Sequence, residues 1–156
     1  MDNMKKIPLT QNKYCIIDDI DFDLISKYKW CFNNTGYAVR GQRRGNKTLI
    51  INMHRFIMNC PDNQEVDHIN NDKLDNRREN LRICSRSENA RNIKKPLHNT
   101  SGFKGVSWRS DRKRWRAYLT YNNKYIHLGH FITKKQAMIA YNTMALIYYG
   151  EFAKLN

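Results

Sequence analysis

The sequence lacks any apolar run that approaches the roughly 18 residues a membrane-spanning helix needs. Its first segment, residues 1–8, is also too polar for a secretory signal peptide. From these two absences we expect a soluble cytoplasmic protein with no membrane partner. Cysteine-rich zinc sites are also poorly supported, because the four cysteines form no C-x-x-C pair. We expect these cysteines to be reduced and mostly buried thiols.

Acidic residues are scarce: 14 Asp and Glu stand against 28 Lys and Arg, which gives a net charge of +14 and a pI near 9.8. This excess favours a polyanionic partner, nucleic acid first and an acidic membrane second. Residues 94–156 hold 12 Lys and Arg against 2 acids, whereas residues 1–93 hold 16 against 12. The positive charge is therefore concentrated in the C-terminal part. A chain of 156 residues suits one ordinary domain or two small ones.

The first 52 residues are expected to be rich in β-strands. A short strand is predicted over residues 14–17, and Asp21 can begin a helical turn. Residues 37–40 and 48–51 are predicted to form a hairpin around a basic turn, residues 41–47. That turn is equally consistent with a contact to a phosphate backbone and with a solvated hairpin tip.

A second pattern begins at Asp67 and His68, which lie in a short predicted strand over residues 65–70. Residues 81–84 alternate like a strand, and Ser85 with Glu88 has the spacing of a helix-capping box. The local prediction is strand, loop, strand, helix, with Asn89 in the first turn of the helix. If the hairpin folds against the helix, Asp67, His68 and Asn89 converge.

Two oxygen donors with open coordination positions suit Mg²⁺, which keeps waters and takes further ligands from phosphate. A neutral histidine beside the ion can take a proton from water near neutral pH. A metal ion and a histidine base suffice for phosphodiester hydrolysis. The alternative is a purely structural role, because Asp-His pairs and Asn in a first helical turn are common.

These motifs resemble the HNH endonucleases, in particular the homing endonucleases of phages and introns. The resemblance covers roughly residues 50–93, and its motifs are Asp67-His68-Ile69-Asn70, Asn80-Leu81-Arg82, Asn89 and, upstream, His54-Arg55. It implies two strands and a helix around one divalent ion, Mg²⁺ or another such as Mn²⁺. Asp67 and Asn89 match the metal ligands, His68 the general base, and Asn80 the residue that orients the loop carrying the base. Three further residues are candidate phosphate contacts: His54, Arg55 and Arg82.

The next segment, residues 94–101, is predicted to be a basic linker, because Pro96 ends the preceding helix. Such a linker can lie along a DNA backbone, and it is equally a flexible tether. Strands are then predicted over residues 105–108, 115–121 and 124–129, with Asn122-Asn123 as a two-residue turn. A helix begins after Thr133, with Gln136 completing a capping box, and ends at Gly150.

Alternation places apolar residues on one face of this sheet and basic and aromatic residues on the other, which can enter a major groove. Residues 102–156 resemble the AP2 domain of plant ethylene-response factors, which is also appended to phage HNH enzymes. The motifs that carry this resemblance are Lys104-Gly105-Val106, Trp115-Arg116-Ala117, His127-Leu128-Gly129-His130-Phe131, Thr133, Ala137, Ala140-Tyr141, Ala145 and Gly150. The DNA-facing positions that the resemblance implies are Lys104, Ser107, Arg109, Tyr118, Thr120, Tyr125 and His127. Arg116 joins them on the alternation alone. The plant domains carry Arg or Trp at several of these positions, so their target sequence does not transfer.

We therefore predict an α+β chain with a β-rich region (1–52), a ββα-metal nuclease core (53–93), a linker (94–101) and a three-stranded antiparallel sheet on one helix (102–156). The predicted activity is metal-dependent hydrolysis of double-stranded DNA, with a monomer cutting one strand at a time. The expected setting is a prokaryotic or phage-infected cell, at the nucleoid, with no obligatory protein partner. The alternatives are a non-catalytic DNA-binding regulator with a vestigial nuclease fold and an RNA-binding protein. The second is weakened by the absence of the aromatic motifs of common RNA modules.

Overall fold

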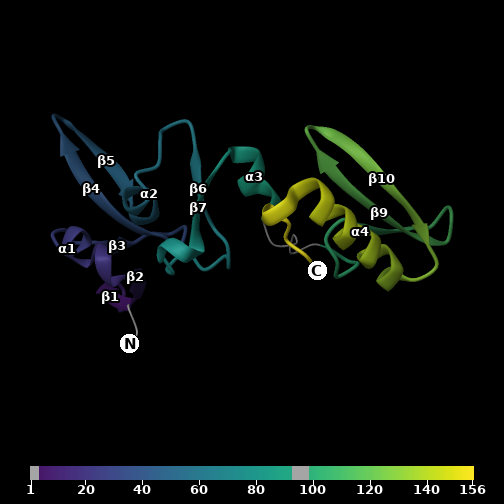
Figure 1. Cartoon of the computed structure of the whole chain (residues 1–156), viewed down its shortest axis with the longest axis horizontal. Helices are drawn as coiled ribbons and strands as arrows, with labels where there is room; N and C mark the ends of the chain where they lie inside the picture. Colours follow the sequence, from purple (N-terminus) through teal and green to yellow (C-terminus); the bar gives the residue numbers. More distant parts are fainter. Residues whose placement is uncertain (1–3, 93–98) are drawn as a thin grey trace. The chain divides into compact units, whose positions relative to one another are not determined.

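Four small antiparallel sheets and a few helices make up residues 4–92 and 99–156, the part of the chain that the computed structural model describes (Figure 1). The mixed α and β content confirms the predicted class in its coarse form. The chain divides into two compact units, Met1–Asn89 and Ala90–Asn156. Most of the predicted linker falls on residues 93–98, which lie outside the described residues.

The N-terminal unit contains three of the sheets. Strand β1 (Met4–Pro8) pairs with β2 (Tyr14–Asp18), and a three-stranded sheet has the order β3 (Cys31–Phe32), β4 (Ala38–Arg44), β5 (Lys47–Asn52). The last sheet pairs β6 (Glu65–His68) with β7 (Leu81–Cys84). The short helices are η1 (Asp19–Asp21), α1 (Phe22–Ile25), α2 (Met53–Ile57), η2 (Arg78–Asn80) and α3 (Arg86–Arg91), the last of which spans the division between the units.

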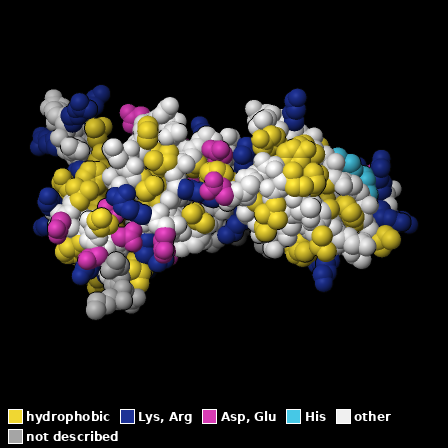
Figure 2. Space-filling view, in the orientation of Figure 1, with side chains coloured by type: hydrophobic (Ala, Val, Ile, Leu, Met, Phe, Trp, Pro, Cys, Tyr) yellow, Lys and Arg dark blue, Asp and Glu magenta, His cyan; other side chains and the backbone are white. Residues whose placement is uncertain are grey.

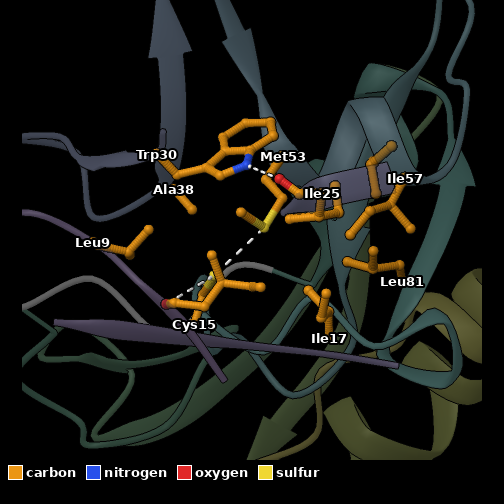
Figure 3. Packing of buried hydrophobic residues seen from close by; sticks show 11 residues of the cluster. Leu9, Cys15, Ile17, Ile25, Trp30, Ala38, Met53, Ile57 and Leu81 are labelled. Atoms are coloured by element: carbon orange, nitrogen blue, oxygen red, sulfur yellow. Dashed lines mark hydrogen bonds between the residues drawn. The ribbon is translucent and has the colours of Figure 1, made fainter. Parts of the chain in front are cut away.

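One hydrophobic cluster holds the N-terminal unit together (Figure 3). Its buried side chains come from both of the predicted N-terminal regions, residues 1–52 and residues 53–93. They are Ile7, Leu9, Cys15, Ile17, Ile25, Trp30, Ala38, Met53, Ile57, Val66 and Leu81. Inside it, the Trp30 indole donates to the Ile25 carbonyl at 2.9 Å, which satisfies the one polar group of that ring. The β-rich region and the β6–β7 hairpin therefore share a core, and the early strands position the later ones.

The hairpin of β4 and β5 is longer than expected. Arg44 pairs with Lys47, so the turn is only Gly45-Asn46, and the prediction of a turn over residues 41–47 was wrong in extent. Gly45 has φ +60°, the left-handed conformation that a two-residue hairpin turn requires. Residues 41–44 are all exposed, so this part of the strand lacks the alternation of apolar and polar residues by which a strand is recognised in a sequence.

The C-terminal unit is a three-stranded sheet in the order β10 (Lys124–Phe131), β9 (Arg114–Tyr121), β8 (Val106–Arg109). Helix α4 (Lys134–Tyr149) packs on one face, where Leu119 meets Tyr141, Ala145 and Tyr149, and the turn η3 (Gly150–Phe152) follows it. The predicted turn is confirmed by positive φ angles at Asn122 and Asn123, and the capping box of α4 is present. These local signals were readable because each depends on neighbours in the sequence.

Gly105 marks the closest approach in this unit. Its φ is +68°, and a Cβ at this position would lie 2.1 Å from the Tyr141 ring and 2.4 Å from the Tyr118 carbonyl oxygen. Only glycine allows the chain before β8 to pass between the helix and β9 at this point.

Two further observations concern the whole of the described chain. Within residues 4–92 and 99–156 no helix is long and apolar enough to cross a membrane. All four cysteines are free thiols; Cys15 and Cys84 are buried, Cys60 is half-buried and Cys31 is exposed. The expectation of mostly buried thiols thus holds for two of the four.

Candidate active site and nucleic-acid interface

Strands β6 and β7 and helix α3 form the predicted strand–strand–helix unit. Asp67 lies opposite Arg82 and His68 opposite Leu81 in the antiparallel ladder. The Ser85 hydroxyl accepts from the Glu88 backbone N–H at 3.3 Å, and a Glu88 carboxylate oxygen accepts from the Ser85 N–H at 2.8 Å. This capping box begins α3 directly after β7, and it fixes Asn89 in the first turn of the helix, as predicted.

Asp67 is buried and held by Arg82. Its Oδ2 accepts from Arg82 Nε at 2.9 Å and from Nη2 at 2.6 Å. Both side chains are nearly inaccessible, so this is a buried, charge-assisted pair. Sequence reasoning named Arg82 as a phosphate contact, but in the structure its guanidinium neutralises the predicted metal ligand.

His68 is also buried, at 5% exposure, and lies 3.2 Å from Asn76 through its Nε2. The Asn76 amide oxygen only accepts, so the neutral ring carries its hydrogen on Nε2, and Nδ1 is the atom that can take a proton. Burial lowers the pKa of His68, while the bond to Asn76 and the charges of Asp67, Asp72 and Asp75 act to raise it. The ring is therefore held in one orientation and is neutral near pH 7, as a general base must be.

Asn80 ties the two ends of the connecting loop together. Its Oδ1 accepts from the Asn70 N–H at 3.0 Å, and its Nδ2 donates to the Asp75 carbonyl at 2.7 Å. The Ile69 N–H also donates to the Asn80 carbonyl at 2.9 Å. These bonds fix the chain directly after His68.

The loop over residues 70–80 is more ordered and more buried than a polar connection would suggest. The Ile16 N–H donates to the Leu74 carbonyl, and the Asn76 N–H donates to the Ile16 carbonyl, both at 2.8 Å. These bonds attach the loop to β2. Asp75 and Asn76 are buried, and Asp75 also binds Arg77. Sequence reasoning missed Asn76 because its partner Ile16 lies sixty residues earlier in the chain.

Asn89 reaches β6 through Glu65, which sequence reasoning also missed. Its Nδ2 donates to Glu65 Oε2 at 2.6 Å, so the amide oxygen is the atom that Asn89 can offer to a cation. Glu65 and Asp67 are two residues apart on one strand, and their side chains therefore leave the same face. The alternation of these two acids in β6 was the available sequence signal.

The donor set fits a hard divalent ion. Asp67 supplies a carboxylate, which Arg82 neutralises in this structure, and Asn89 supplies an amide oxygen, with its amide nitrogen bonded to Glu65 of the same strand as Asp67. In residues 4–92 and 99–156 no three His, Cys, Asp or Glu side chains gather into a fuller metal cage. Mg²⁺ is usually bound by one or two protein oxygens, and water and phosphate oxygens complete its coordination shell.

His54 and Tyr37 line the other side of His68. The His54 ring centroid lies 5.0 Å from that of His68 and 4.9 Å from that of Tyr37. His54 is buried, its Nδ1 has no hydrogen-bond partner, and burial lowers its pKa to about 3. Arg55, by contrast, donates to the carbonyls of Cys60, Pro61 and Gln64, so its guanidinium fixes the turn before β6.

The C-terminal unit carries the other predicted residues on the face of its sheet away from α4. Arg116 donates to the Ser107 hydroxyl at 3.0 and 3.2 Å, and its guanidinium lies 4.9 Å from the centre of the Tyr118 ring. Tyr118 and Tyr125 stack with centroids 5.1 Å apart. In the ladder Tyr125 lies opposite Thr120, and His127 lies opposite Tyr118. The alternation predicted from sequence thus brings these side chains onto one surface.

Two predicted contacts are engaged within the unit. The Lys104 ammonium donates to the Arg91 carbonyl at 2.6 Å, and burial lowers its pKa to about 8. Arg109 forms a bidentate pair with Asp111 at 3.0 and 3.1 Å on the exposed turn between β8 and β9. Lys104 is therefore bonded to a backbone carbonyl of its own unit, whereas Arg109 remains at the surface.

Comparison with known proteins points to one family. A family model described as HNH endonuclease matches residues 59–91, the range that contains Asp67, His68, Asn80 and Asn89. The chain is 32% identical over 139 residues to an uncharacterised HNH endonuclease of Acanthamoeba polyphaga mimivirus, covering 85% of this chain and 69% of that protein. It is 41% identical over 64 residues to protein 3.8 of Escherichia phage T7, covering 41% of this chain and 53% of that protein. No solved structure matches.

Proposed function

The chain belongs to the HNH endonuclease family, and on this basis we propose that it hydrolyses phosphodiester bonds in double-stranded DNA with His68 as the general base and a divalent ion held by Asp67 and Asn89. The observation that carries the proposal is the immobilised, neutral His68. Its Nε2 is bonded to Asn76, and the chain after it is tied down by Asn80. A base fixed in one tautomer can accept a proton from water at Nδ1 without reorganising.

The proposed ion, Mg²⁺ or Mn²⁺, would neutralise charge on the scissile phosphate and on the leaving oxygen. Asp67 and Asn89 would hold it, and Glu65 orients Asn89 by accepting from its amide nitrogen. A hydrogen bond from a metal-binding side chain to a neighbour, here from Asn89 to Glu65, fixes the direction of the oxygen that binds the metal. In this proposal Arg82 shares Asp67 with the ion, and it restrains the carboxylate when no ion is bound.

We further propose that the C-terminal unit holds the DNA. Its sheet face combines arginines with stacked tyrosines, and residues 94–156 carry most of the net positive charge. An antiparallel sheet can place side chains in a major groove, and this is the use that we propose for it. One active site acts on one strand at a time, so a monomer nicks.

The second candidate is a DNA-binding regulator in which the nuclease fold no longer cuts. The observation in its favour is the Asp67–Arg82 pair, which places a fixed positive charge where a metal ligand is needed. Breaking a buried ion pair leaves an uncompensated charge and costs on the order of 3–5 kcal/mol. If binding of the metal ion does not offset this cost, the ion does not bind and the protein binds DNA without cutting it.

A plasmid-nicking assay separates the two candidates. Supercoiled DNA is incubated with the full chain and Mg²⁺ or Mn²⁺, with and without EDTA, and binding is measured in parallel. We expect open-circular DNA only with the metal. Binding without nicking in either metal would support the regulator, and nicking that persists in EDTA would exclude the metal site.

A further inference from the structure

A β-bulge brings two histidines onto one face of the C-terminal sheet. Residues three apart in a regular strand point to opposite faces. The register of β9 and β10 shifts between His127 and Gly129, so that His127 lies opposite Tyr118 and His130 lies opposite Arg116. Gly129 has φ +130°, a conformation that side chains rarely allow. The ring centroids of the two histidines are consequently only 4.6 Å apart.

The histidines border an open hollow of about 290 Å³. Three arginines surround it from three segments: Arg109 from β8, Arg112 from the turn and Arg116 from β9, with Tyr125, His127 and His130 from β10. Figure 2 shows histidine side chains beside Lys and Arg side chains on this unit. Arg109 is pre-positioned by Asp111, and Arg116 by Ser107. The hollow is thus lined by cationic and hydrogen-bond-donating groups held in place by neighbours.

The chemistry of this lining selects an oxyanion. Guanidinium groups only donate, and they bind phosphate oxygens through two parallel hydrogen bonds. Three converging guanidinium groups also concentrate positive charge, which a backbone phosphate neutralises and an uncharged base edge does not. We propose that this hollow binds one phosphate of the DNA backbone and that His127 and His130 join Arg109, Arg112 and Arg116 in holding it. The proposal rests on the proposed function, because it names the part of the DNA that this surface contacts.

Such a site couples binding to protons. Desolvation and the neighbouring side chains, above all the guanidinium of Arg112, lower the pKa of His130, so the ring is neutral near pH 7 in the free protein. The groups that line the hollow with it are Arg109, Arg112, Arg116, Tyr125 and His127, and the carboxylate of Asp111 is paired with Arg109 and lies 4.0 Å from Arg112. A bound phosphate adds negative charge and raises that pKa. Binding therefore takes up a proton, and affinity rises as the pH falls.

The test measures the affinity of the full chain for a short random duplex in EDTA, at constant ionic strength, from about pH 8 to about pH 5.5. We expect affinity to increase towards low pH, by at most about tenfold per pH unit for each proton taken up. His130→Gln should lose most of this increase, so that its affinity changes little between the two ends of the pH range. Lys124→Gln, which removes a charge from β10 outside the hollow, should weaken binding at every pH and keep the pH dependence.

A second variant does not depend on a histidine. Arg112→Ala, on the exposed turn, should weaken binding to all sequences alike and reduce the slope of log affinity against log salt by about one. The phosphate site is overturned if His130→Gln keeps the full pH dependence, or if Arg112→Ala leaves the salt slope unchanged, while the protein still binds DNA. A chain that binds no DNA at any pH contradicts the proposed function itself.

Discussion

The two units use polar residues in opposite ways. In the N-terminal unit the polar side chains of the candidate site are buried or half-buried and bonded to one another: Asp67 to Arg82, His68 to Asn76, and Asn89 to Glu65. In the C-terminal unit Arg116, Tyr118 and Tyr125 stack on an open sheet face. Fixed, neutralised groups suit chemistry, and accessible cations suit binding of a polyanion. Most of the net positive charge of this chain therefore lies in the C-terminal unit, whereas the candidate catalytic groups lie in the N-terminal unit.

The largest expected effect comes from removing the base. His68→Ala should lose about 10²–10⁴-fold in cleavage rate, because that is the usual value of a positioned general base. DNA affinity should stay unchanged, since the binding surface is in the other unit. Single-turnover cleavage and binding isotherms measure the two, and thermal unfolding checks the fold. Cleavage at the wild-type rate would remove His68 from the mechanism.

A smaller effect is expected where one side chain orients a ligand. Glu65→Gln keeps the size of the side chain but loses the charge that holds the Asn89 amide. The metal concentration for half-maximal cleavage should rise by about 10–100-fold, the usual cost of losing an outer-shell partner. Metal titrations of cleavage provide the measurement, with Glu79→Gln as a control at an exposed acid. Equal titration curves for Glu65→Gln and the wild type would show that Asn89 needs no such support.

Gly105 offers a way to disturb the C-terminal unit alone. Gly105→Ala places a methyl group against the Tyr141 ring and should destabilise this unit by about 1–3 kcal/mol beyond the cost of its positive φ. Gly102→Ala is the matched control: its φ is +82°, and nothing lies within 4 Å of the added atom. The difference between their free energies of unfolding isolates the steric overlap. Equal losses in the two variants would mean that β8 moves freely away from α4.

The N-terminal unit should be the more sensitive to acid. His54 titrates at its ordinary pKa near 6.5 when unfolded, but burial lowers that pKa to about 3 in the folded chain. The unfolded state therefore binds more protons between these values, and stability falls as the pH decreases, by at most about 1.4 kcal/mol per pH unit. Urea unfolding from pH 7 to 4 should show a shallower decline for His54→Gln than for the wild type. Parallel declines would show that His54 is not the group responsible.

Much of the fold was predictable because its signals are local. The capping boxes at Ser85 and Thr133, the Asn122-Asn123 turn and the alternation of β9 all depend on residues close in sequence. The candidate site was predictable only in part. Asp67, His68 and Asn89 follow a motif, but Asn76 is positioned by a strand sixty residues earlier. The alternation of Glu65 and Asp67 is visible in the sequence, whereas the bond between Glu65 and Asn89 is visible only in the folded chain. The bulge at Gly129 likewise placed His130 on a face that strict alternation denies it.

The division of labour is tested most directly by measuring cleavage and affinity for two variants of the full chain, His68→Ala and Arg116→Ala, in the same buffer. With enzyme in excess over a labelled duplex, we expect His68→Ala to bind normally and not to cut. Arg116→Ala should bind more weakly and cut at the wild-type rate once saturated. A loss of both cleavage and affinity in each folded variant would contradict the separation of chemistry from binding.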